Sequence, residues 1–153
     1  MFYFTVYTSR PRMPMTHDVL NEITKQSAKN NKEIGVTGML LGIENRYLQY
    51  LEGDEEQVKT LLQRIKKDGR HYDVTQWVSG FCKDRIFSEW SMGSWMMKNS
   101  ELEKLEAAKE IHTFLNNPES QAHSSKKFLA MIDGLLKTWI THEPERSLRL
   151  KQL

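Results

Sequence analysis

Tyr7 and Gln49 are polar side chains in segments whose pattern predicts buried β-strands. Residues 2–8 are rich in aromatic and β-branched side chains, and alternation in residues 47–51 puts Gln49 on the same face as a tyrosine and a leucine. A carboxamide offers both a donor and an acceptor, and a buried amide without partners costs about 1–3 kcal/mol. A buried phenol also needs a partner. Two possibilities stay open: Tyr7 and Gln49 bond to each other, or a ligand bonds to them.

Further polar side chains lie near the ends of two predicted helices. Asn30 and Asn31 follow the first helix, where asparagine commonly caps a helix or forms a turn. A charged set occurs around the end of the second helix: Arg64, Asp68, Arg70 and His71. Cations at the negative end of a helix dipole would explain part of this set, and a ligand held by both helices is the alternative.

Signatures of catalysis and metal binding are missing from the sequence. The five histidines make no short-spaced pair with each other or with Cys82, so a zinc site is not expected. There is no phosphate-binding loop, nucleophile elbow or dinucleotide-binding glycine pattern. We therefore expect neither a bound metal nor an enzyme active site.

The elements that must position these side chains alternate in type. Helical spacing predicts helices over residues 16–30 and 55–67, and apolar runs predict strands over residues 2–8, 36–43, 47–51, 74–81 and 90–97. Trp90 and Met92 share one side of the last strand, a pairing that more often fills a core than lines a cofactor site. This order predicts an α+β fold, a ferredoxin-like sandwich whose five-stranded mixed sheet carries two helices on one face.

The remainder of the chain is predicted to be helical. Two apolar stripes lie beyond residue 98, and the second contains Phe128, Ile132, Leu135, Leu136 and Trp139. We expect a domain over residues 1–97 and an appended helical extension over residues 98–153 that covers the other face of the sheet and carries an output contact.

Length, charge and cysteine content narrow the class of protein. The chain has 153 residues, a net charge of +2 and one cysteine. No run approaches the roughly 20 apolar residues of a membrane span, and residues 1–5 do not begin a signal peptide. We expect a cytoplasmic protein that binds neither membrane nor nucleic acid.

Several motifs, taken in order, resemble the BLUF family of blue-light sensors that use flavin. They are Tyr7-Thr8-Ser9, Asn30-Asn31 with Gly35-Val36-Thr37-Gly38-Met39-Leu40-Leu41, Tyr47-Leu48-Gln49-Tyr50-Leu51-Glu52-Gly53, Asp68-Gly69-Arg70-His71, and Arg85-Ile86-Phe87 through Trp90-Ser91-Met92. The resemblance spans residues 1–97. It departs from the family at Gly42, where an aromatic residue is common, and at Tyr47, where phenylalanine is frequent.

The resemblance implies a flavin (FAD, with FMN or riboflavin as possible substitutes) whose polar rim faces Tyr7, Asn31 and Gln49. It also implies flavin contacts from a wider set: Asn30, Arg64, Asp68, Arg70 and His71. In such a protein Tyr7 gives an electron and a proton on excitation, and Gln49 then rotates or changes tautomer. Trp90 and Met92 transmit the change, and the resemblance does not decide which of the two is the inner residue.

As a sensor, the chain is expected to signal to an unidentified partner protein and to form homo-oligomers. Two other functions are alternatives to this interpretation. An acylphosphatase-like hydrolase would need an anion cradle after the first strand, but residues 9–15 contain prolines and methionines instead. An RNA-binding sheet would use exposed aromatics such as Phe4 and Tyr50, but the chain has no basic face or matching motif. We also expect no enzyme within the chain, because residues after 98 are too few for a cyclase or phosphodiesterase domain.

Overall fold

A single mixed sheet is the centre of the computed structural model, which describes residues 1–88, 91–98, 104–117 and 125–142. Its strands run in the order β4-β1-β3-β2-β5. They are β1 (Phe2–Pro11), β2 (Thr37–Ile43), β3 (Arg46–Gly53), β4 (His71–Cys82) and β5 (Gly93–Met97). Neighbouring strands are antiparallel except β2 and β5, which are parallel. The predicted ferredoxin-like α+β fold with a five-stranded mixed sheet is confirmed.

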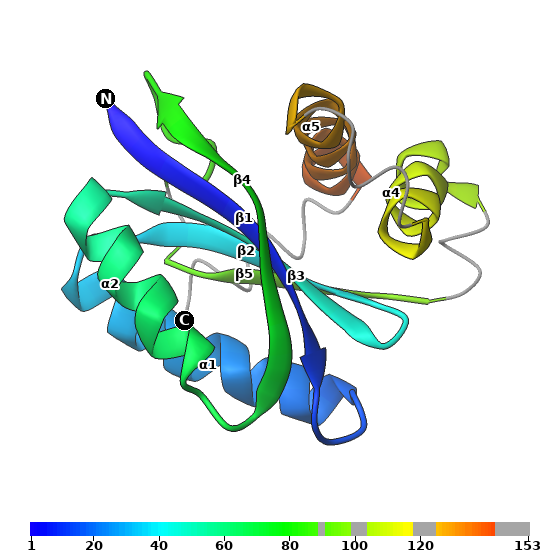
Figure 1. The fold of residues 1–153 in the computed structure, drawn as a ribbon, viewed down its shortest axis with the longest axis horizontal. Helices are drawn as coiled ribbons and strands as arrows, with labels where there is room; N and C mark the ends of the chain where they lie inside the picture. The colour runs from blue at the N-terminus through cyan, green and yellow to red at the C-terminus, as the bar shows by residue number, and fades with distance from the viewer. Residues whose placement is uncertain (89–90, 99–103, 118–124, 143–153) are drawn as a thin grey trace.

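Two helices, α1 (His17–Glu33) and α2 (Glu55–Lys66), pack on one face of this sheet (Figure 1). Thr16 caps α1 by accepting a hydrogen bond from the Val19 amide at 3.2 Å. Asp54 caps α2 in the same way, with its Oδ1 accepting from the amides of the next turn at 3.0 and 3.2 Å. Both helices begin where the sequence predicts.

The other face of the sheet is covered by α4 (Glu106–Asn116) and α5 (Ser125–His142) (Figure 1). Trp77 on β4 meets Phe114 and Phe128 with ring centroids 5.4 and 5.5 Å apart. Phe128, Ile132 and Leu135 of the expected stripe are buried. The Leu136 and Trp139 side chains lie outside the described set. These helices therefore cover the second face, as expected.

The structure differs from the sequence prediction at some element ends. Helix α1 continues to Glu33, so Asn30 and Asn31 lie in its last turn and do not follow it. Strand β5 begins at Gly93, which leaves Met92 in the connection before the strand. Trp90 lies outside the described residues.

Glycines on β2 allow close packing that a side chain would prevent. A Cβ on Gly38 would lie 2.1 Å from the main-chain oxygen of Tyr50. A Cβ on Gly42 would lie 2.6 Å from Met15 Sδ, so the Met15 side chain occupies space that an aromatic at position 42 would need. The departure at Gly42 is therefore matched by Met15.

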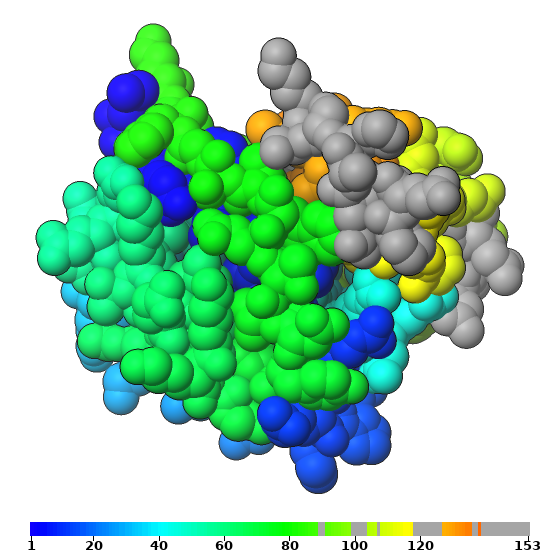
Figure 2. Space-filling model, viewed as in Figure 1, coloured from blue at the N-terminus to red at the C-terminus, as the bar shows by residue number. Residues whose placement is uncertain are grey.

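Strand β4 forms one edge of the sheet, and Figure 2 shows it at the surface between α2 and α5. Phe4 and Tyr50, which the RNA-binding hypothesis needs on the surface, are only 8% and 2% exposed beneath α5.

Among the helices that the structure describes, none has the length and apolar character that a membrane span requires.

Candidate functional site

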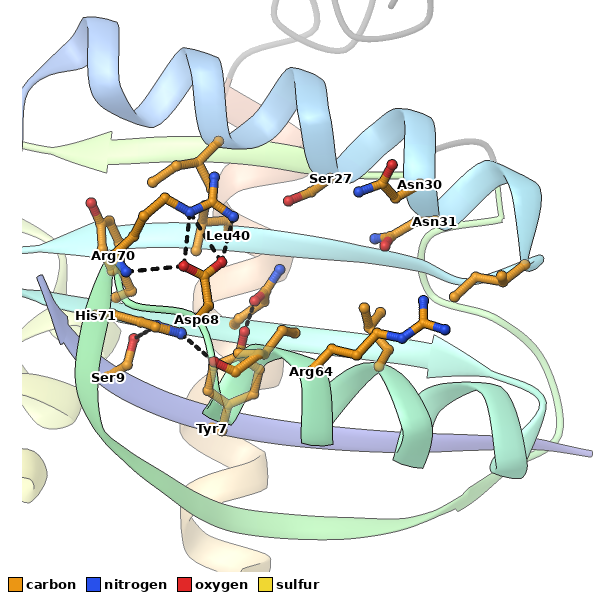
Figure 3. A pocket seen from close by; sticks show the side chains of 16 residues that line it. Tyr7, Ser9, Ser27, Asn30, Asn31, Leu40, Arg64, Asp68, Arg70 and His71 are labelled. Atoms are coloured by element: carbon orange, nitrogen blue, oxygen red, sulfur yellow. Dashed lines mark hydrogen bonds and ion pairs between the residues drawn. The ribbon is translucent and has the colours of Figure 1, made fainter.

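A cavity of about 180 Å³ lies between α1 and α2, with the sheet as its floor (Figure 3). Every side chain that the sequence suggests as a cofactor ligand lines it: Tyr7, Asn30, Asn31, Gln49, Arg64, Asp68, Arg70 and His71. These residues come from both helices, from β1 and β3, and from the segment that enters β4. The fold therefore brings the whole proposed ligand set together in one place.

The floor of the cavity holds a chain of hydrogen bonds. Tyr7 and Gln49 are register partners on β1 and β3, and the Tyr7 hydroxyl donates to Gln49 Oε1. Gln49 Nε2 in turn donates to Met92 Sδ at 3.5 Å. All three residues are almost fully buried. The internal Tyr–Gln pair therefore exists, and Met92 is next to the amide.

Burial controls the protonation of Tyr7. Desolvation, with a smaller contribution from the negative charge of Asp68, raises the pKa of the Tyr7 phenol far above its ordinary value. The phenol consequently stays protonated and can only act as the donor toward Gln49 Oε1. In the structure the amide presents its oxygen to Tyr7 and its nitrogen to Met92.

Asn31 connects α1 with the segment before β5. Its side chain is 2% exposed, and Nδ2 donates to the Ser91 carbonyl oxygen at 3.0 Å. The main-chain carbonyl oxygen of Asn31 accepts a hydrogen bond from the Val36 amide at 2.9 Å. Asn31 therefore fixes the end of α1, whereas the neighbouring Asn30 is exposed at the cavity rim.

Asp68 and Arg70 form an ion pair at the other end of the cavity (Figure 3). Arg70 Nη2 lies 2.5 Å from Asp68 Oδ2, and the Arg70 amide donates to Asp68 Oδ1 at 2.9 Å. Gln26 Oε1 accepts from Arg70 Nη1 at 3.0 Å. Hydrogen bonds from Arg70 are the main cause of the lowered pKa of Asp68. The carboxylate is thus held ionised by its neighbour.

His71 has both ring nitrogens engaged within the protein. Nε2 lies 2.6 Å from the Ile65 carbonyl oxygen, and Nδ1 lies 2.8 Å from Ser9 Oγ. Because a carbonyl only accepts, Nε2 carries the hydrogen and donates it. In the neutral ring Nδ1 then accepts from the Ser9 hydroxyl. His71 consequently ties α2 to β1 at the cavity wall.

Arg64 differs from Asp68, Arg70 and His71 in that its charged group is not bonded to a neighbour among the described residues. Within the part of the chain that the structure describes, its guanidinium has no hydrogen bond or ion pair. Figure 3 shows it extending from α2 across the cavity from Asn30 and Asn31. A cation and two amides thus face one opening, which suits a ligand with several acceptor atoms.

Eight further residues line the cavity that were not predicted from the sequence: Ser9, Ile23, Ser27, Ile34, Leu40, Tyr47, Leu61 and Ile65. Ile23, Ser27 and Ile34 follow helical spacing together with Asn30 and Asn31, so one face of α1 lines the cavity. That spacing could have revealed them. The described residues include no group of three or more metal-binding side chains.

A comparison with protein families matches residues 2–93 to the BLUF model, described as sensors of blue-light using FAD. The photoactivated adenylate cyclase subunit beta of Euglena gracilis is 34% identical over 89 residues, which are 58% of this chain and 10% of that protein. The blue light- and temperature-regulated antirepressor BluF of Escherichia coli strain K12 is 31% identical over 57% of this chain and 22% of that protein. This chain therefore spans only a small part of the curated relatives it matches.

A solved structure agrees with this match. The dark-state structure of BlrB, a BLUF protein, superimposes with a TM-score of 0.65 at 27% identity, and covers 79% of this chain and 89% of that one.

Proposed function

Because the chain belongs to the BLUF family of blue-light sensors that use FAD, we propose that the cavity between α1 and α2 holds the flavin ring and that light rearranges the hydrogen bonds of Tyr7, Gln49 and Met92. One observation carries this proposal: the buried Tyr7 hydroxyl donates to Gln49, and the same amide reaches Met92. A light-driven change at Gln49 would consequently alter both contacts at once.

The residues around the cavity fit a flavin. A flavin rim alternates acceptors with a donor, and carboxamides offer both kinds of group. Asn30, Asn31 and Gln49 supply three amides, Arg64 supplies a cation without a partner in the described chain, and apolar side chains flank the ring space. We propose that Asn30, Asn31, Arg64 and Asp68 bond the polar edge or the ribityl chain. FAD is the family's cofactor, and FMN or riboflavin would present the same ring and chain.

The bound flavin would supply absorption of blue light and acceptance of an electron. The hydrogen-bonding groups that would respond belong to Tyr7 and Gln49. Tyr7 keeps its proton on the side of Gln49 Oε1 until light acts. If the amide then turns, Nε2 faces Tyr7, whose oxygen accepts, and Met92 loses its donor. No net chemical change is needed, only a different set of hydrogen bonds.

We propose that Met92 passes this change onward. Met92 directly precedes β5, which pairs in parallel with β2 and leads toward α4 and α5. Residues 1–97 then form the sensor and residues 98–153 the output, which contacts a partner protein in the cytoplasm or a second copy of the chain. Trp90 and Trp139 are also predicted to take part in this route, and both lie where the structure describes no side chain.

A test of the site uses Tyr7→Phe with Tyr3→Phe as its matched control. Both residues are buried tyrosines of β1 on the side of α1 and α2, but only Tyr7 bonds to Gln49. We expect blue light to shift the flavin absorption of the parent slightly to the red. Both variants should bind about one flavin per chain, and only Tyr7→Phe should lose this shift. A Tyr7→Phe protein that responds like the parent would show that the role given to Tyr7 is wrong.

The output role has a separate test. We expect hydrogen exchange of β5, α4 and α5 to differ between darkness and blue light, and Trp139→Ala to change the hydrodynamic size. Unchanged exchange and an unchanged size would leave these helices as a passive cover of the sheet.

A further inference from the structure

Glu52 is the only charged side chain that is fully buried among the described residues, with 0% exposure. It lies near the end of β3, on the face opposite to Gln49, next to the rings of Phe4 and Tyr50. A buried carboxylate is costly unless hydrogen bonds compensate it. The burial of this carboxylate therefore needs a physical explanation.

Four donors compensate this carboxylate. Oε1 accepts from the Phe87 amide at 2.6 Å and from the Thr37 hydroxyl at 3.1 Å. Oε2 accepts from the Ile86 amide at 2.9 Å and from the Tyr50 hydroxyl at 3.1 Å. Burial, and then the Glu52 charge, raise the pKa of Tyr50, so this phenol stays a donor. The acceptor positions of the carboxylate are filled.

Two of these donors are main-chain amides of the connection between β4 and β5. Arg85 fixes the same connection, with Nη2 donating to the Gly35 oxygen at 2.7 Å and Nη1 to the Thr37 hydroxyl at 2.9 Å. Phe87 is 1% exposed and packs its ring edge-on against Tyr50 at 5.6 Å. Residues 85–87 are thus held on the ends of β2 and β3.

The same connection ends at the flavin site. Beyond residues 88–90, the Ser91 oxygen accepts from Asn31 and Met92 accepts from Gln49. Strand β3 therefore contacts this connection from both faces, through Glu52 on one side and Gln49 on the other. Gln49 is the contact that light is proposed to break, and Glu52 is the contact that remains.

We infer that Glu52 is a positioning residue of the photocycle: its carboxylate anchors residues 86–87 and thereby holds Met92 against Gln49. This inference rests on the proposed function of the site. Without the anchor, the connection would change arrangement more easily, and the chain would return to its dark form faster. Flavin binding should be unaffected, because Glu52 does not line the cavity.

Glu52→Gln tests this inference most directly, because it keeps the size of the side chain and removes one of its acceptor oxygens. The two amides use different oxygens, so whichever way a glutamine turns, Ile86 or Phe87 faces an amide nitrogen and loses its acceptor. Loss of such a bond predicts dark recovery about tenfold faster, equivalent to about 1.4 kcal/mol. Tyr50→Phe is the matched control, because it removes one donor from Glu52 and leaves both amide bonds in place.

The measurement is the dark-recovery rate of the flavin absorption in the full chain, with the thermal midpoint recorded beside it. We expect Glu52→Gln to recover about tenfold faster and Tyr50→Phe to recover within about twofold of the parent, even if both lower the midpoint. Arg85→Lys loosens the same connection from the surface, and it decides the matter if Glu52→Gln does not fold. We expect this variant to recover faster than the parent as well.

The two proposals fail in different ways. A parent chain that takes up no flavin or shows no light response would contradict the proposed function. A parent that cycles normally while folded Glu52→Gln, or Arg85→Lys in its place, recovers at the parental rate would overturn the inference. An equal acceleration in Tyr50→Phe would also overturn it, because the effect would then follow from general loosening of the core.

Discussion

A double-mutant cycle on Tyr7 and Gln49 measures the hydrogen bond on which the proposed switch depends. Tyr7→Phe leaves Gln49 Oε1 buried without its donor, and Gln49→Leu leaves the Tyr7 hydroxyl without its acceptor. Each single variant should lose about 1–3 kcal/mol of unfolding free energy, because an unpaired buried polar group keeps its desolvation cost. The double variant removes both groups and should lose less than the sum, with a coupling energy of about 1–2 kcal/mol.

The assay is urea unfolding of the four proteins at the same saturating flavin concentration. The flavin contribution, RT ln(1 + [L]/Kd), is subtracted for each variant with its own measured Kd. For a chain of this size each kcal/mol also lowers the thermal midpoint by about 2–4 °C, which gives a second readout. Single-variant losses that add to within about 0.5 kcal/mol would refute a direct, buried bond between the two side chains.

Three further predictions concern buried phenols, an ion pair and a close backbone contact. Burial raises the pKa of Tyr7 and Tyr50, so these phenols stay protonated in the folded chain and favour unfolding as pH rises above about 10. Their tyrosinate absorbance, identified by comparison with the Tyr7→Phe and Tyr50→Phe variants, should appear only together with the loss of circular dichroism. Ionisation of either phenol before that loss would contradict this prediction. The pKa of Asp68 is lowered mainly by Arg70, so their pair stabilises the fold above about pH 4 and loses its effect as pH falls further. Since both side chains are partly exposed, Asp68→Asn should cost only about 0.5 kcal/mol in urea unfolding at neutral pH and progressively less as pH falls below about 4. A cost that does not change with pH would argue against the ion pair. Gly38→Ala would place its Cβ 2.1 Å from a main-chain oxygen and should lower stability by about 3 kcal/mol, and a thermal midpoint equal to the parent's would contradict that packing.

The faces of the strands and the starts of the helices could be predicted from the sequence because short-range patterns determine them. Alternation along residues 47–51 places Gln49 on one face with Tyr47 and Leu51, and the structure has all three on the side of α1 and α2. Thr16 and Asp54 are N-caps that act within their own first turns. The pairing of Tyr7 with Gln49 then requires that β1 and β3 lie side by side in the register that places these two residues opposite each other.

Features that depend on distant segments could not be predicted in this way. In the sequence, Glu52 comes directly after an apolar strand and has the pattern of a polar residue at an exposed strand end. Its burial depends on the main-chain amides of Ile86 and Phe87, which are distant in the sequence. The bond from Asn31 to Ser91 likewise depends on a connection that closes over the end of α1. The position of Met92 beside Gln49 follows from where β5 begins, and irregular segments carry no periodicity from which to predict that.

The light-minus-dark absorption spectrum of the purified chain shows whether light rearranges the hydrogen bonds around a bound flavin. We expect a yellow protein whose flavin absorption shifts slightly to the red under blue light, returns in darkness and leaves the flavin oxidised, because only the hydrogen bonds around Gln49 change. Gln49→Leu should bind flavin and show no shift. A parent chain without a reversible shift, or a Gln49→Leu variant that shifts like the parent, would contradict the account.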